Sequence, residues 1–140
     1  MAAPAQARYG GVNCKQWGAQ VTVDAINLCL QTRADYVEAP PIQAHFTYKI
    51  WVTIGPSATT ADTCTVTGWA TFRSSSATWN SPKQLRGCSA ALRTGTVYDM
   101  AIMSTDTTAT YFAPHGCITL DWDSGERWQQ CYSGEGVRAN

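Results

Sequence analysis

Two histidines are the residues of this 140-residue sequence best suited to acid–base chemistry. A histidine can activate a neighbouring nucleophile, so a secreted hydrolase built on His45 or His115 is one hypothesis. Neither belongs to a Gly-x-Ser-x-Gly motif, although a catalytic triad can also assemble from separate strands. The simpler interpretation is that His45 is an exposed strand residue and His115 a loop residue. We therefore expect no catalytic residue and no enzyme.

A group of carboxylates surrounds Gly125 and could be a glycosidase pair or the start of a calcium loop: Asp121, Asp123 and Glu126. The third Asp/Asn ligand and the distal glutamate of a calcium loop are missing. A structural interpretation is simpler, because Asp121 can pair with Arg127 and Asp123 can cap a turn. We expect neither a metal nor a cofactor.

Trp51 and Trp69 are the candidate binding residues on the strands. Each falls on the polar side of an alternating segment, so its ring would face solvent or a partner. Exposed aromatic rings suit sugar stacking or a protein interface. Cover by a second sheet or by residues 74–87 is the alternative. Trp122 and Trp128 alternate with apolar residues instead, and we expect them in the core.

Residues 8–18 are expected to form an extended arm pinned by Cys14. Arg8 or Tyr9 on this arm could dock into a pocket of another chain, because extended segments add to sheet edges and fill clefts. A frayed terminus is the alternative.

Residues 117–131 predict a β-hairpin that turns at residues 123–125. Gly125 tolerates the positive φ of a glycine bulge. This register places Cys117 opposite Cys131 and Asp121 opposite Arg127, so the hairpin predicts a Cys117–Cys131 disulfide.

The six cysteines predict three disulfides, because their spacings match no zinc motif. Six cysteines allow 15 connectivities. With Cys117–Cys131 paired, the simplest remainder is Cys14–Cys29 and Cys64–Cys88.

The elements that would position these residues are strands. The clearest alternation covers residues 42–54 and 63–73, and turn signals separate further strands at 19–32, 96–104 and 108–113, the last two as a hairpin. The fold class predicted is all-β: an antiparallel, disulfide-stapled β-sandwich, immunoglobulin-like, with a β-barrel as the alternative. We expect four segments: a flexible start or signal-peptide remnant (1–7), the arm (8–18), the sandwich (19–132) and a polar tail (133–140).

Charge and composition limit the partners. Ten basic residues balance ten acidic ones with no basic run, so nucleic acid is not expected. No apolar run reaches the length of a membrane span, about 20 residues. Ala5-Gln6-Ala7 has the form of a signal-peptide cleavage site, which predicts a secreted protein.

Several features together resemble those of small exported actinobacterial β-sandwich proteins, among them the adaptor subunit of the umbrella toxin particles made by Streptomyces. The residues that carry this resemblance are Ala5-Gln6-Ala7, Cys14, Cys29, Gly116-Cys117-Ile118-Thr119, Trp128 and Cys131-Tyr132. The resemblance implies a non-catalytic connector that joins a lectin-like subunit to a large toxin polypeptide.

We therefore expect a secreted, non-catalytic module that binds another secreted protein, as the adaptor of a complex or as an enzyme inhibitor. A carbohydrate-binding module that uses Trp51, Trp69 or Trp79 is the alternative.

Overall fold

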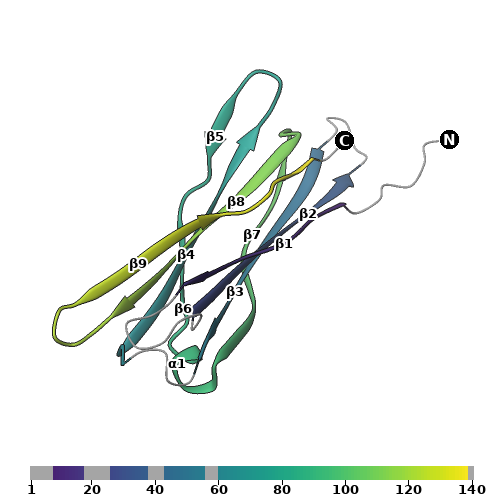
Figure 1. Cartoon of the computed structure of the whole chain (residues 1–140). Helices are drawn as coiled ribbons and strands as arrows, with labels where there is room; N and C mark the ends of the chain where they lie inside the picture. Colours follow the sequence, from purple (N-terminus) through teal and green to yellow (C-terminus); the bar gives the residue numbers. More distant parts are fainter. Residues whose placement is uncertain (1–7, 18–25, 38–42, 56–59, 139–140) are drawn as a thin grey trace.

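Two antiparallel β-sheets packed face to face make up the protein in the computed structural model, which describes residues 8–17, 26–37, 43–55 and 60–138 (Figure 1). The four-stranded sheet has the order β1-β2-β3-β7. Its strands are β1 (Arg8–Trp17), β2 (Ile26–Val37), β3 (Gln43–Ile54) and β7 (Thr96–Thr107). The predicted sandwich is confirmed, and the barrel alternative is wrong because the sheets do not close on each other.

The six-stranded sheet is built around β4 (Thr63–Arg73) and β8 (Tyr111–Asp121), which pair along their whole length. Two short strands lie along the other side of β4, and two more lie along the other side of β8. These are β5 (Thr78–Asn80), β6 (Gln84–Gly87), β9 (Arg127–Ser133) and β10 (Val137–Arg138).

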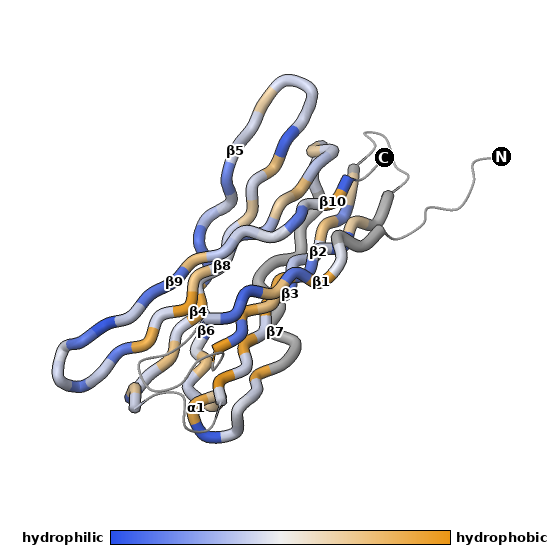
Figure 2. Tube along the Cα trace, in the orientation of Figure 1, coloured by the Kyte–Doolittle hydropathy of each residue, from blue (hydrophilic) through white to orange (hydrophobic). Residues whose placement is uncertain are grey.

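Alternation of apolar and polar residues places the core between the sheets. Even-numbered residues of β3 from Ala44 to Ile54 are buried, as are those of β4 from Cys64 to Phe72. Phe112 of β8 joins them, stacked on Phe46 with ring centroids 4.9 Å apart. Figure 2 shows the hydrophobic stretches on β3, β4 and β8 and the mostly hydrophilic β8–β9 turn.

The hairpin expected from residues 96–104 and 108–113 is wrong. β7 pairs with β3 in one sheet, and β8 pairs with β4 in the other, so the chain crosses between the sheets after Thr107. Both segments have the alternation of a strand, but alternation does not tell which strand is the neighbour.

Three segments expected to lie outside the sheets, the arm, the 74–87 connection and the tail, contribute strands to them. Residues 8–17 of the arm form β1, which pairs with β2. The connection at 74–87 contains β5 and β6, and Val137 in the tail is buried where β10 pairs with β8. A four-residue helix, α1 (Ala91–Thr94), ends at Gly95, whose φ of 86° suits glycine. Residues 1–7 lie outside the described part of the chain.

All six cysteines are bonded, in the pairs expected from the sequence: Cys14–Cys29, Cys64–Cys88 and Cys117–Cys131. The hairpin register is also as predicted, with Cys117 opposite Cys131 and Arg127 Nε 2.7 Å from Asp121 Oδ1. Trp122 and Trp128, expected in the core, pack against the core cluster but are half-buried, so they lie at its border. Within the described residues, no helix is long and apolar enough to cross a bilayer.

Candidate functional site

A row of three side chains crosses the outer face of the six-stranded sheet. Trp69 of β4 is opposite His115 of β8, and His115 is opposite Ser133 of β9. The odd-numbered residues of β4 and β8 point away from the core, so the register brings these side chains together at the surface. We call Trp69, His115, Ser133 and their hydrogen-bond partners the histidine cluster.

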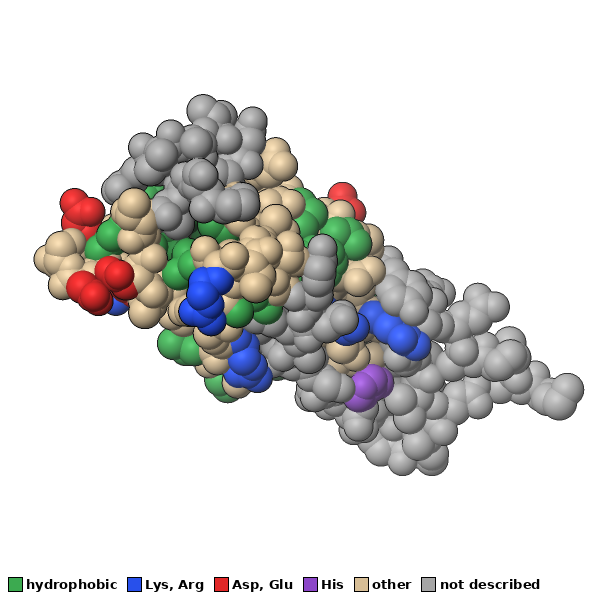
Figure 3. All heavy atoms as spheres, turned by 90° about the horizontal axis from the view of Figure 1, so that it is seen from below, with side chains coloured by type: hydrophobic (Ala, Val, Ile, Leu, Met, Phe, Trp, Pro, Cys, Tyr) green, Lys and Arg blue, Asp and Glu red, His purple; other side chains and the backbone are tan. Residues whose placement is uncertain are grey.

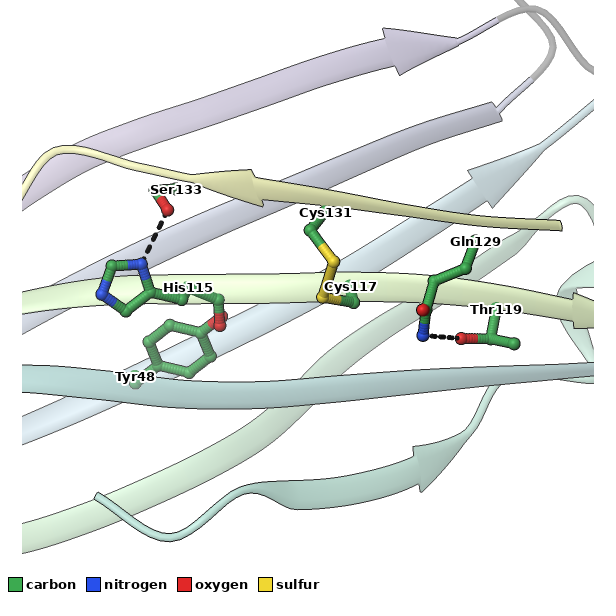
Figure 4. Close-up of a disulfide and its surroundings, with 7 residues drawn as sticks. All are labelled: Tyr48, His115, Cys117, Thr119, Gln129, Cys131 and Ser133. Atoms are coloured by element: carbon green, nitrogen blue, oxygen red, sulfur yellow. Dashed lines mark hydrogen bonds between the residues drawn. A yellow bond between two sulfur atoms is a disulfide. The ribbon is translucent and has the colours of Figure 1, made fainter. Parts of the chain in front are cut away.

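His115 is held at both ring nitrogens. Its Nε2 lies 2.7 Å from Thr71 Oγ1. Its Nδ1 lies 2.7 Å from Ser133 Oγ, the contact drawn in Figure 4. The Thr71 hydroxyl donates its only proton to Asn80 Oδ1 at 2.8 Å, so it must accept from His115 Nε2–H. Burial lowers the pKa of His115, and the neutral ring then accepts the Ser133 proton at Nδ1. The hydrogen-bond network thus assigns the tautomer.

This arrangement contains a nucleophile and a base, but the third group differs from that of a catalytic triad. A triad holds its histidine with a carboxylate that stabilises the imidazolium. Here the Thr71–Asn80 pair takes that place, and no carboxylate among the described residues bonds to the ring. The network is well suited to fixing the orientation of the imidazole.

A core side chain also fixes the backbone of His115, from the inner side of the sheet. Buried Tyr48 crosses the interior from β3 and donates its hydroxyl to the backbone oxygen of His115 at 2.7 Å (Figure 4). Gly116 leaves room for this approach, because a Cβ there would lie 3.2 Å from the Tyr48 oxygen and 2.7 Å from Ile50 Cδ1. Burial raises the pKa of Tyr48 well above its usual range, so the hydroxyl remains a donor.

Trp69 faces outward as predicted, but its ring is partly covered. The His115 ring stacks on it with centroids 5.3 Å apart, and Lys83 Nζ lies 4.7 Å from its centroid. Lys83 belongs to the 74–87 connection, so the alternative prediction, that this connection covers Trp69, is confirmed in part. A cation over an aromatic ring is a stabilising contact, so Trp69 is not a free stacking platform.

The other predicted binding residues lie elsewhere and are not brought together with Trp69. Trp51 is half-buried on the outer face of the four-stranded sheet, opposite Cys29 and its disulfide. Arg8 and Tyr9 belong to β1, where their backbones pair with Ala34 and Arg33. Their side chains lie outside the described part of the structure.

The carboxylate group is at the β8–β9 turn, where the predicted Asp121–Arg127 pair is confirmed, whereas the turn cap expected of the Asp123 side chain is not among the hydrogen bonds of the described residues. Asp121 pairs with Arg127, and Asp62 Oδ2 accepts a hydrogen bond from the Asp123 backbone at 2.7 Å. Figure 3 shows acidic side chains gathered at the end of the molecule where this turn lies in Figure 1. In the described residues, no cluster of three or more metal-ligating side chains occurs.

Sequence reasoning missed four members of the site: Thr71, Asn80, Lys83 and Ser133. Asn80 and Lys83 lie on a connection whose strands are too short to alternate, and Ser133 begins the expected tail. The outward position of Thr71 was visible from the alternation of β4, but its role depends on strand neighbours distant in sequence.

The chain matches no protein-family model, no curated protein and no solved structure.

The histidine cluster predicts a pH dependence of folding. An unfolded chain protonates His115 near the ordinary pKa of about 6.5, whereas the folded protein resists protonation because burial lowers this pKa. Stability contributed by neutral His115 should be present above pH 6.5 and decrease as the pH falls through that value. Urea denaturation at several pH values between 7.5 and 5 should show a steeper decrease for the wild type than for His115→Gln. Parallel curves would contradict the prediction.

Proposed function

We propose that this protein is a secreted, non-catalytic module that binds another protein as an adaptor in a secreted complex. One observation carries the proposal. Three large apolar side chains are well exposed in the described part of the chain, namely Val12 (53%), Trp79 (38%) and Leu85 (63%). Two of them lie on one edge of the six-stranded sheet, in β5 and β6. We call residues 78–87 the β5–β6 edge.

The β5–β6 edge has the anatomy of a binding surface. Both strands pair with β4 and, within the described residues, with no other strand. An unpaired edge presents backbone donors and acceptors, to which an extended segment of a partner can add. Trp79 is opposite core-facing Phe72. Leu85 is opposite outward-facing Thr67, so the two side chains lie on opposite faces of the sheet. They would anchor the two faces of an added segment with the apolar contacts that dominate protein interfaces.

The charge of the edge indicates the kind of partner. Residues 74–90 contain Lys83 and Arg86 but no aspartate or glutamate. Both cations are exposed, and Lys83 is held over Trp69. A partner with an acidic strand or loop beside apolar pockets would complement this edge.

The disulfides support the proposal that the protein is secreted. Three bridges in 140 residues are typical of proteins that fold in an oxidising compartment. The resemblance to adaptor subunits of bacterial toxin particles supports the same role. An enzyme inhibitor would use the same surface. The identity of the captured partner, an enzyme or another subunit, distinguishes an inhibitor from an adaptor.

A pull-down from the secreted fraction of the producing organism tests the proposal. The wild type should capture a stoichiometric partner, and the double variant Trp79→Ser/Leu85→Ser should lose at least 90% of it. Val12→Ser, an exposed apolar residue on the opposite sheet, is the matched control and should retain the partner. Circular dichroism must show that all three proteins are folded. Equal capture by the double variant, or no partner at all, would contradict the proposal.

Carbohydrate binding is the second candidate, and Trp79 is the observation that favours it. Its exposed ring lies nearly parallel to that of Phe72, with an interplanar angle of 12° and centroids 5.6 Å apart. A flat ring held in this way can stack on a sugar. Titration of tryptophan fluorescence with neutral glycans should then give a response that Trp79→Ser abolishes.

A further inference from the structure

A cavity lies at the end of β8 remote from the acidic turn. Its volume is about 430 Å³, and its lining is basic and hydroxylated: Arg73, Ser74, Ser75, Thr108, Thr110, Tyr111 and Arg138. We propose that it binds a phosphate ester carried on a sugar or polyol. This proposal goes beyond the adaptor role and uses a different surface.

Strand pairing builds the cationic part of the cavity. Tyr111 of β8 is opposite Arg73 of β4 on one side and opposite Arg138 of β10 on the other. Both guanidinium groups lie against the Tyr111 ring, with Cζ atoms 5.1 Å and 5.6 Å from its centroid. Cation–π contact holds both arginines in place before any ligand binds.

Gly136 fixes the ring that the two arginines share. A Cβ at Gly136 would lie 2.4 Å from Tyr111 Cζ, so only glycine lets the segment before β10 pass against the ring at this distance. Arg138, two residues later, thus reaches the same Tyr111 ring as Arg73 and lines the same pocket.

Within the described residues, no ion pair neutralises the two positive charges, because no carboxylate there forms a salt bridge with Arg73 or Arg138. The acidic β8–β9 turn lies roughly 33 Å away along β8, beyond the screening length of physiological salt. An anionic ligand would supply the missing charge.

Guanidinium geometry favours a phosphate. Arginine presents N–H donors in a planar fork that matches two oxygens of a phosphate group. Ser74 Oγ accepts hydrogen bonds from the backbone N–H groups of Ser76 and Ala77, which leaves its proton free for an oxyanion.

The cavity also has room for more than the anion. Its volume falls within the range of small-molecule sites, about 300–1,000 Å³. The hydroxyls of Ser75, Thr108 and Thr110 line the remainder and suit the hydroxyls of a sugar or polyol. Nucleic acid fits poorly, because two guanidiniums and Gly136 already occupy the Tyr111 ring.

Isothermal titration calorimetry with sn-glycerol 3-phosphate and glucose 6-phosphate tests the proposal on the full chain. The wild type should bind both esters, more weakly as salt is added. Arg73→Gln and Arg138→Gln should each weaken binding roughly tenfold. Arg73→Lys keeps the charge and should lose less. Arg93→Gln, at an exposed arginine of α1 outside both proposed sites, is the matched control and should bind normally.

Three outcomes would overturn the proposal: equal binding of glycerol or glucose, an equal loss in Arg93→Gln, or no binding of either ester. Inorganic phosphate bound as tightly as the esters would refute the polyol part. A sulfate ester bound more tightly than its phosphate counterpart would refute the choice of phosphate. Partner capture by Arg73→Gln/Arg138→Gln should be unchanged, so failure here is distinguishable from failure of the adaptor role.

Discussion

Replacing Phe112 by alanine should lower the free energy of unfolding by about 3–5 kcal/mol. Phe112 is fully buried, and three aromatic rings surround it: Phe46 at 4.9 Å, Phe72 at 5.1 Å and Tyr48 at 6.4 Å between centroids. These rings come from both sheets, so truncation opens a cavity in the contact that joins the layers. A single domain has a total stability of about 5–15 kcal/mol, so the loss is a large share.

Urea denaturation measures this effect. Phe112→Leu keeps most of the volume and should cost markedly less than Phe112→Ala. Leu85→Ala removes an apolar side chain that is 63% exposed and should change stability by no more than about 0.5 kcal/mol. If Phe112→Ala cost no more than Leu85→Ala, the aromatic cluster could not be the centre of the core.

The second large effect is expected from the Cys64–Cys88 disulfide. Replacing both cysteines by alanine should cost about 2–5 kcal/mol. This bridge closes the longest of the three loops, with a sequence separation of 24, and ties the end of β6 back to β4. Both cysteines are buried, so their loss also leaves unfilled volume in the core.

The surface bridge Cys117–Cys131 gives the matched comparison. It joins residues already opposite each other in the β8–β9 hairpin, and Cys131 is exposed. Denaturation of Cys117→Ala/Cys131→Ala should therefore show a smaller loss than that of Cys64→Ala/Cys88→Ala. A larger loss in the hairpin variant would show that burial of the bridge does not determine its contribution.

Local signals explain which parts of this fold could be predicted. The bounds of β3 and β4 follow from alternation, and Gly125 with the cysteine pair sets the hairpin register. The choice of sheet for β7 and β8 could not be predicted, because it depends on strand partners distant in sequence. β5, β6 and β10 are too short for alternation to show.

The histidine cluster could be predicted in part from local sequence, whereas the pocket around Tyr111 could not. The outward position of Trp69 follows from its strand, but its cover by Lys83 depends on a connection without a repeating pattern. The pocket around Tyr111 had no sequence signal, since Arg73 and Arg138 become neighbours only through the pairing of β4, β8 and β10. A glycine against the ring is visible only in three dimensions.

The placement of the three disulfides has a mechanical consequence. Each bridge joins segments of one sheet, and none links the four-stranded sheet to the six-stranded sheet. A pulling force applied between β1 and β10 would therefore load an interface that, among the described residues, is held by side-chain packing and the Tyr48 hydrogen bond. The two sheets would separate before the strands within either sheet did. The segments closed by the three disulfides could not extend, because each bridge holds their ends together. A protein built in this way would yield under tension between its layers and could close again, because the disulfides keep the strand pairing within each sheet.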